Sequence, residues 1–241
     1  DYFDYLNGTD NINQTGLSPF TGGSRMIQNK IMTPGETYIL GVLFLITGSI
    51  IGLYLAYERG IFLLLIGTMG LFSGYYYTAP PVFFAGRGLG ELLVGLNFGV
   101  LSVAGSYYVQ AQGFSFAAVF ASLPLLFLIA AILYINEFPD YDADKAVGKN
   151  HLVVYLGMER ARWGFLFIVA WAYISIIAGV ILDLLPITAL FVIPAAILGI
   201  KAVKGLFENY KKTVELIPSI KATILCHLAT GIGLIVIFLV S

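Results

Sequence analysis

The sequence predicts an all-α protein that crosses a membrane several times as one helical bundle over residues 1–241. Three observations support this prediction. First, 59% of the 241 residues are hydrophobic and 11% are charged, whereas soluble domains are about 45–50% apolar and roughly 25% charged. Second, the mean hydropathy is +0.88. Third, the apolar runs reach the length of about 20 residues that a spanning helix needs, and they lack the alternation typical of barrel strands.

Seven such segments follow one another along the chain. Each carries little or no charge and is bounded by charged or turn-forming residues. The uncharged run from Leu92 to Asn136 is long enough for two spans, and the turn-forming stretch 110–113 divides it. Asp183, close to Pro186, divides the next long run. The predicted spans are 37–57, 61–79, 89–109, 115–138, 163–182, 184–202 and 219–240.

Lysine and arginine are distributed unevenly between the two sides of this bundle. If the spans alternate in direction, one side carries the connections 1–36, 80–88, 139–162 and 203–218. All but one of the 13 Lys and Arg residues lie in or beside these connections, and the exception is Arg59. Basic connections stay in the cytoplasm. The prediction is therefore a multi-pass protein of the cell membrane whose loops 1–36 and 139–162 face the cytoplasm.

Two further counts exclude whole classes of function. A formal net charge of −1 offers no positive field to a phosphate backbone, so no nucleic-acid partner is expected. The single cysteine, Cys226, excludes an internal disulfide and any multi-cysteine metal site.

Acidic residues gather in two clusters on the predicted cytoplasmic side. The first cluster consists of Asp1, Asp4 and Asp10. The second consists of Asn136, Asp140 and Asp144. Residues four apart share one face of a helix, so the second cluster predicts a polar stripe at the end of the span 115–138. Pro139 predicts a kink or a new turn there.

The paired carboxylates predict a magnesium site. Two carboxylates one turn apart on an exposed helix repel each other by about 0.2–0.5 kcal/mol, and a divalent cation between them reverses the sign. Mg²⁺ prefers carboxylate oxygens and leaves coordination positions open for phosphate oxygens. Two clusters that face each other could hold a diphosphate between them. The predicted metal ligands are Asp1, Asp4, Asp140 and Asp144.

Five stretches of the chain carry motifs that point to a known family. They are DYFDYLNGTD at 1–10, PFTGGSR at 19–25, YTAPP at 77–81, RGLGE at 87–91 and NEFPDYDADKAVGK at 136–149. Together they resemble the UbiA superfamily of intramembrane aromatic prenyltransferases, with motif similarity over residues 1–157. The glycine-rich loop and the stretch 77–91 look most like the branch that prenylates 1,4-dihydroxy-2-naphthoate toward menaquinone.

The resemblance also implies a longer protein. The family has nine spans, and its first acidic motif follows the second of them. Asp1 stands at the first acidic position of that motif, so two spans are expected to be missing from this chain, and the complete protein is expected to have nine. The family often has a third Asp where this chain has Gly8, and the next acid here is Asp10.

The resemblance further implies a reaction. A prenyl group passes from an isoprenyl diphosphate (geranylgeranyl, farnesyl or longer) to a ring carbon of an aromatic quinone precursor within the lipid bilayer. The four aspartates at positions 1, 4, 140 and 144 are then catalytic, because the Mg²⁺ that they hold neutralises the leaving diphosphate. Asn136 is expected to orient a ligand or to coordinate the metal directly.

Four basic residues near these clusters are candidates for binding the diphosphate. Arg25 can make bidentate contacts to phosphate, and the alternative for it is an interfacial anchor. Lys30, Lys145 and Lys149 are weaker candidates, and the alternative is that each serves only as a topology charge.

Other residues carry less specific signals. Tyr77 is expected to stabilise an allylic cation, or to belong to an aromatic belt. Asn97 lies inside a span and is a candidate for binding the aromatic acceptor. The alternative is that it forms a hydrogen bond between helices. Glu91 enters the same span, and His151 is expected to be a loop residue. The glycines at 48, 52, 67, 70 and 74 are predicted to allow helices to pack closely.

Three other functions are open at this point. A secondary transporter of an anionic substrate would suit seven spans, but transporter sites lie near the bilayer midplane and these acids lie at one edge. Another lipid-modifying intramembrane transferase would use a non-aromatic acceptor. A non-catalytic lipid-binding or scaffold protein would have no need of the aspartates.

Overall fold

The computed structural model describes residues 1–8 and 23–240, and every regular element within them is helical. The α-helices are α1 (Tyr2–Asn7), α3 (Pro34–Arg59), α4 (Phe62–Tyr75), α5 (Gly90–Gly95), α6 (Ser102–Ala111), α7 (Phe116–Ala146), α8 (Leu152–Leu156), α9 (Met158–Ile181), α10 (Ala196–Asn209) and α11 (Ile217–Val240). Between them lie the 3-10 helices η1 (Phe84–Gly86), η3 (Ile187–Ala195) and η4 (Val214–Leu216), and the π-helical turn η2 (Leu96–Leu101).

The predicted all-α polytopic bundle is confirmed. Within the described residues, six helical segments are long and apolar enough to cross a membrane. They are Pro34–Arg59, Gly90–Ala111, Phe116–Ala146, Met158–Ile181, Ile187–Asn209 and Val214–Val240. The remaining predicted span, 61–79, contains α4, an apolar helix of 14 residues. This helix is shorter than the about 20 residues that a span needs.

Local sequence explains where the long helices begin. At the start of α3, the Thr33 hydroxyl accepts a hydrogen bond from the Glu36 N–H at 3.2 Å, and the Glu36 carboxylate accepts one from the Thr33 N–H at 2.7 Å. This reciprocal cap satisfies two backbone donors, and Pro34 in the first helical position has a suitable φ. At the start of α7, the Ser115 hydroxyl accepts a hydrogen bond from the Ala118 N–H at 3.2 Å.

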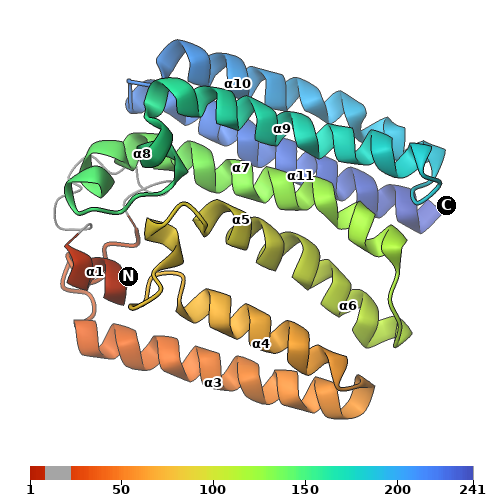
Figure 1. Ribbon diagram of the computed structural model, residues 1–241, viewed down its shortest axis with the longest axis horizontal. Coiled ribbons are helices and arrows are strands. Elements are labelled where there is room, and N and C mark those ends of the chain that lie inside the picture. The colour runs from red at the N-terminus through yellow and green to blue at the C-terminus, as the bar shows by residue number, and fades with distance from the viewer. Residues whose placement is uncertain (9–22, 241) are drawn as a thin grey trace.

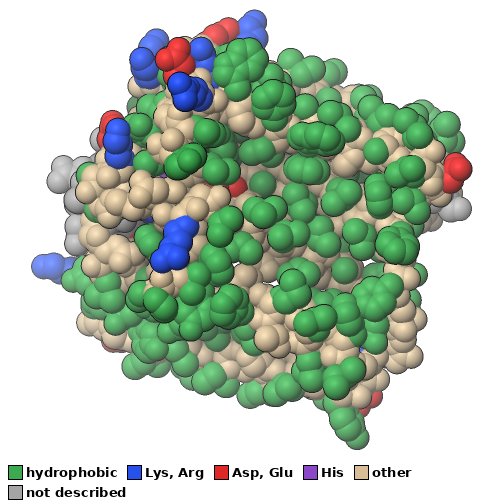
Figure 2. All heavy atoms as spheres, viewed as in Figure 1, with side chains coloured by type: hydrophobic (Ala, Val, Ile, Leu, Met, Phe, Trp, Pro, Cys, Tyr) green, Lys and Arg blue, Asp and Glu red, His purple; other side chains and the backbone are tan. Residues whose placement is uncertain are grey.

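The long helices lie side by side, with α7 between the α5–α6 segment and the group α9, α10 and α11 (Figure 1). The buried core is formed mainly by this group and α7, and includes Leu128, Ile135, Phe165, Ile176 and Leu206. By contrast, α3 and α4 each bury a single residue, Ala56 and Ser73 respectively. Hydrophobic side chains cover most of the face in Figure 2, as a surface in contact with lipid requires.

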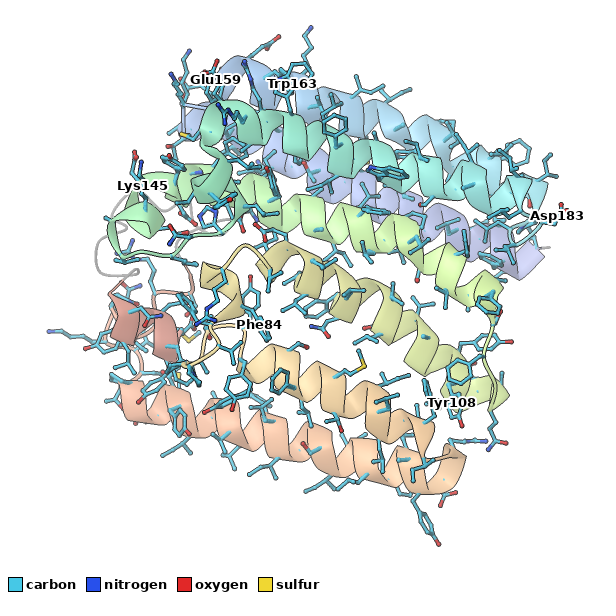
Figure 3. All side chains as sticks on the ribbon, viewed as in Figure 1. Phe84, Tyr108, Lys145, Glu159, Trp163 and Asp183 are labelled. Carbon is cyan, nitrogen blue, oxygen red and sulfur yellow. The ribbon has the colours of Figure 1, made fainter. Side chains whose placement is uncertain are left out.

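The two ends of the bundle differ in charge. In Figure 2, Lys and Arg side chains gather at the end that carries α1 and α8. Lys145 and Glu159 lie at this end, and Asp183 lies at the opposite end (Figure 3). The basic connections predicted to share one side therefore lie at one end of the helices.

Glycines allow close packing at different positions from those predicted. A Cβ added to Gly48, Gly52, Gly67, Gly70 or Gly74 would meet no atom within 4 Å, so the expectation of close packing at these positions is wrong. Several of them instead line an apolar cavity of about 540 Å³ along α3 and α4. The close approach occurs at Gly95 and Gly99, where an added Cβ would lie 2.7 Å from backbone atoms of Leu126 in α7.

Candidate active site at one end of the bundle

The second acidic cluster lies on the last turns of α7. This helix continues through Pro139 as far as Ala146, so the predicted stripe of Asn136, Asp140 and Asp144 is helical, and the expected break at the proline does not end the helix. The segment 139–162, expected as a connection, therefore contains the end of α7, the short helix α8 and the start of α9.

The first acidic cluster lies on α1. Asp1 precedes this helix at the N-cap position, and its Oδ2 accepts a hydrogen bond from the Ser24 hydroxyl at 2.6 Å, which joins the loop before Arg25 to the cluster. Asp4 Oδ1 is buried and has no hydrogen-bond partner among the described residues. Arg25, the residue after Ser24, has a positive φ of 55° and is partly buried. Asp10 lies outside the described residues.

Asp144 is the most enclosed of the four predicted metal ligands. It is buried, and its two oxygens face two cations. Oδ1 lies 3.5 Å from Lys149 Nζ, and Oδ2 lies 3.1 Å from His151 Nε2. Lys149, one of the weaker candidates for binding the diphosphate, therefore lies beside a predicted metal ligand.

Lys149 lies within electrostatic range of both acidic clusters. Burial lowers the pKa of the Lys149 ammonium group, but nearby carboxylates outweigh this effect and raise the pKa above its ordinary value. These carboxylates belong to Asp144, Asp4, Asp140 and Glu137. Since Asp4 comes from the first cluster and Asp140 from the second, both clusters act on one lysine.

Tyr77 lies among the same acids. Burial is the main cause that raises the pKa of its phenol, and negative charges add to the effect. These charges belong to Glu137, Glu91, Asp4 and Asp144. The ring packs on Gly90, where an added Cβ would lie 3.4 Å from the Tyr77 ring and hydroxyl. The glycine of the RGLGE motif thus makes room for the tyrosine of the YTAPP motif.

Asn136 lies in the second cluster, and its Oδ1 is buried without a hydrogen-bond partner among the described residues. Three other candidates make the following contacts. Lys145 is exposed and lies over the Tyr141 ring at 5.5 Å. Lys30 is exposed, at the turn that follows Arg25. Asn97 Nδ2 donates a hydrogen bond to the Ser73 hydroxyl at 2.9 Å, which joins η2 to α4.

A sequence model of the UbiA prenyltransferase family matches residues 1–216. The chain belongs to this family. The resemblance seen in the motifs is confirmed, and with it the expectation of a prenyltransferase, at the level of the family.

Three relatives show which members of the family the chain is similar to. The chain is 27% identical to the 1,4-dihydroxy-2-naphthoate octaprenyltransferase of Bacillus subtilis (strain 168) over 224 residues, and this matched stretch covers 92% of the chain and 70% of that protein. The chain is 33% identical over 129 residues to the 2-carboxy-1,4-naphthoquinone phytyltransferase of Synechocystis sp., which covers 54% of this chain and 42% of that protein. It is 30% identical over 164 residues to the 1,4-dihydroxy-2-naphthoate octaprenyltransferase of Escherichia coli (strain K12), with 67% and 53% covered.

These relatives agree with the menaquinone-type branch of the family. The chain spans only about half of the length of two of them, with 42% and 53% covered. No solved structure matches the chain.

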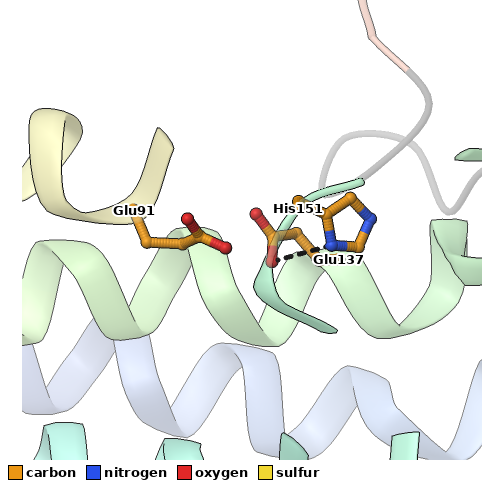
Figure 4. A group of neighbouring side chains, drawn as sticks. All are labelled: Glu91, Glu137 and His151. Carbon is orange, nitrogen blue, oxygen red and sulfur yellow. Dashed lines mark ion pairs between the residues drawn. The ribbon is translucent and has the colours of Figure 1, made fainter. Parts of the chain in front are cut away.

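The protein also contains a buried group of side chains that its sequence did not predict. Glu91, Glu137 and His151 come from α5, from α7 and from the residue before α8, and lie together (Figure 4). His151, expected to be a loop residue, is 1% exposed. Burial lowers the pKa of His151, but hydrogen bonds to Asp144 and Glu137 outweigh this effect and raise the pKa to about 9.

Two backbone hydrogen bonds bring this group together. The Asn150 N–H donates to the Gly86 carbonyl at 3.1 Å, and the Leu152 N–H donates to Glu91 Oε1 at 2.8 Å. The first bond joins η1 to the loop before α8, and the second joins α5 to the first residue of α8. The sequence signal was weak but present, because Glu91 and Glu137 are acidic residues at the ends of otherwise apolar segments, where buried charges tend to be functional.

Proposed function

We propose that this chain is the catalytic part of an enzyme that transfers a prenyl group from an isoprenyl diphosphate to an aromatic quinone precursor within the membrane. The observation that carries the proposal is that each acidic cluster of this UbiA family member holds a buried oxygen without a hydrogen-bond partner among the described residues, Asp4 Oδ1 in the first and Asn136 Oδ1 in the second. The names of the relatives support a naphthoate-type acceptor. The prenyl donor is proposed to be a geranylgeranyl, farnesyl or longer diphosphate.

The residues of the two clusters fit Mg²⁺. Asp4 Oδ1 and Asn136 Oδ1 are buried oxygens without hydrogen-bond partners among the described residues, and buried oxygens normally have a partner. Carboxylate and amide oxygens are ligands that Mg²⁺ accepts. We assign Asp1, Asp4, Asp140 and Asp144 as the ligand set, with Asn136 beside them. When bound, the ion supplies Lewis-acid neutralisation of charge on the diphosphate.

The basic residues complete the proposed donor site. Lys149 contacts Asp144 at 3.5 Å through a single long ion pair, so its ammonium group can turn to a diphosphate oxygen without losing charge compensation. Arg25 adjoins Ser24, which holds Asp1, and a guanidinium there can form bidentate contacts to phosphate. Lys30 and Lys145 are exposed, and we expect them to contribute less.

Tyr77 is proposed to face the carbocation. In the reaction, the bond between the prenyl C1 and the diphosphate oxygen breaks with its electron pair on the diphosphate, and a ring carbon of the acceptor forms a bond to C1. The same ring carbon then loses its substituent, as a proton or as carbon dioxide where it carried a carboxylate, and the electron pair of that bond restores the aromatic ring. An aromatic face stabilises a desolvated cation by about 2 kcal/mol. The carboxylates around Tyr77 add an attractive field for the same charge.

We further propose that the site faces the cytoplasm and that the protein lies in the cell membrane. Basic residues favour the cytoplasmic side, and they gather at the end that carries α1 and α8 (Figure 2). The same position at one end of the helices disfavours transport, which places its site near the midplane.

The test uses the full-length protein in lipid nanodiscs, supplied with farnesyl or geranylgeranyl diphosphate and a panel of aromatic acceptors. Prenylated product is expected with Mg²⁺ and not with EDTA. Asp4→Asn and Asp140→Asn are expected to lower the rate by about 100-fold or more, as removal of a group that stabilises transition-state charge does. Asp142→Asn is the matched control, because Asp142 is exposed on the same helix. Product formed at the normal rate in EDTA would exclude the metal, and no product with any acceptor would exclude the reaction.

A further inference from the structure

Glu91, Glu137 and His151 form a buried cluster beneath the acidic site. Their exposed fractions are 2%, 8% and 1%. One ligand atom from each lies within 4.8 Å of the other two, and the Glu91 and Glu137 carboxylates point toward each other (Figure 4). Three segments far apart in the sequence therefore bring two carboxylates and an imidazole to one point.

Glu91 has one oxygen without a hydrogen-bond partner among the described residues. Glu91 Oε1 accepts the hydrogen bond from the Leu152 N–H at 2.8 Å, and Glu91 Oε2 is buried without a hydrogen-bond partner among the described residues. A buried carboxylate oxygen without a partner is costly. A cation at the centre of the cluster would satisfy it.

His151 is held in the orientation of a metal ligand. Its Nε2 lies 3.1 Å from Asp144 Oδ2, and its Nδ1 points at Glu137 Oε2 at 3.2 Å. Nδ1 also accepts a long hydrogen bond of 3.4 Å from the Val154 N–H. With a hydrogen on Nε2, which faces Asp144, the lone pair of Nδ1 lies between Glu137 and this N–H, and an ion bound there would replace the long hydrogen bond. A histidine that binds a metal through one nitrogen usually donates its other N–H to a carboxylate in this way.

We propose that Glu91, Glu137 and His151 bind a first-row divalent transition-metal ion, at a site separate from the aspartates assigned to Mg²⁺. Two carboxylates with one imidazole suit Mn²⁺, Fe²⁺, Co²⁺ or Zn²⁺, whereas Mg²⁺ favours oxygen ligands alone. The ion joins α5 and α7 to the loop before α8, and Asp144 orients its histidine ligand.

The test uses Co²⁺ as the probe, because its visible absorption reports the ligand field. Full-length protein in nanodiscs is stripped with EDTA and then kept in excess Mg²⁺, which fills the aspartate site. We expect one Co²⁺ per chain with visible bands that Zn²⁺ abolishes and further Mg²⁺ does not. Glu91→Gln and His151→Gln are expected to weaken the Co²⁺ affinity by about 100-fold or more, since even loss of a residue that only orients a ligand costs about 10- to 100-fold.

Two matched variants give the controls. Asp142→Asn, on an exposed position of the same helix as Glu137, and Asp4→Asn, in the aspartate site, are both expected to retain the Co²⁺ bands. Gel filtration and thermal unfolding in Mg²⁺ show which variants are folded. The proposal is overturned if the unaltered protein gives no such bands, or if folded His151→Gln binds Co²⁺ as tightly as the unaltered protein. Loss of the bands in Asp4→Asn would also overturn it, by placing the ion among the aspartates. Because Co²⁺ binding is measured directly, the result does not depend on whether prenyl transfer is observed.

Discussion

Asp144 Oδ2 lies 3.1 Å from His151 Nε2, and both side chains are buried. Through this contact the last turn of α7 is joined to the loop before α8, and the far nitrogen of the same imidazole reaches Glu137 at 3.2 Å. One histidine thus links a carboxylate of the proposed magnesium site to a carboxylate of the deeper cluster.

This contact predicts a large stability effect. His151→Leu leaves the Asp144 and Glu137 carboxylates buried without their shared cation, and breaking a buried pair in this way costs about 3–5 kcal/mol. We expect a loss of about 3 kcal/mol in the free energy of unfolding, measured by denaturation in mixed micelles without divalent metal. Tyr155→Leu, at a side chain that is 79% exposed, is the control. Equal stability of the two variants would contradict the role given to His151.

Replacing Gly99 or Gly48 by alanine is expected to change the stability of the protein in opposite directions. Gly99→Ala places a Cβ 2.7 Å from backbone atoms of Leu126, and overpacking of this kind costs about 1–3 kcal/mol. Gly48→Ala meets no atom within 4 Å, and replacing glycine by alanine inside a helix favours the helix by up to about 1 kcal/mol. Thermal unfolding in detergent should therefore shift down for Gly99→Ala and stay level or rise for Gly48→Ala. A reversed order would refute the packing described for α5–η2 against α7.

Lys149 predicts a kinetic effect on the diphosphate substrate. Lys149→Met removes a charged hydrogen-bond donor from the proposed donor site, and such bonds contribute about 1.5–3 kcal/mol. We expect the KM for the isoprenyl diphosphate to rise by about tenfold or more, with a smaller change in the KM for the acceptor. Lys212→Met is the control, because Lys212 is exposed. An unchanged KM in Lys149→Met would remove this lysine from the donor site.

Asn97 and Ser73 predict a coupled pair. Their side chains exchange hydrogen bonds of 2.9 and 3.0 Å between η2 and α4, and such bonds between membrane helices contribute about 0.6 kcal/mol on average. Asn97→Ala, Ser73→Ala and the double variant should show non-additive losses of stability in a double-mutant cycle. Additive losses, combined with a raised KM for the acceptor in Asn97→Ala alone, would instead favour the acceptor-binding role predicted from the sequence.

The sequence by itself determined the fold class and the family. Apolar segments of spanning length and the distribution of Lys and Arg are properties of contiguous stretches, so they can be read without knowing which helices touch. The motifs around Asp4, Asp140 and Tyr77 are also contiguous, and they were sufficient to indicate the UbiA family. The polar stripe from Asn136 to Asp144 followed from helical periodicity alone, and the structure confirms its helical form.

Only the tertiary structure decided which residues meet. Glu91 is 61 residues from Leu152, whose N–H holds its carboxylate, and no local pattern predicts that contact. The burial of His151 and the partner of Asn97 depend on other segments in the same way. The glycines at 48, 52, 67, 70 and 74 look like Gly95 and Gly99 in the sequence, yet an added Cβ would meet no atom within 4 Å at the first five and would lie 2.7 Å from the Leu126 backbone at the last two. Packing is a relation between distant segments, which is why hydropathy and spacing determined the helices, whereas their assembly determined the buried cluster of Glu91, Glu137 and His151.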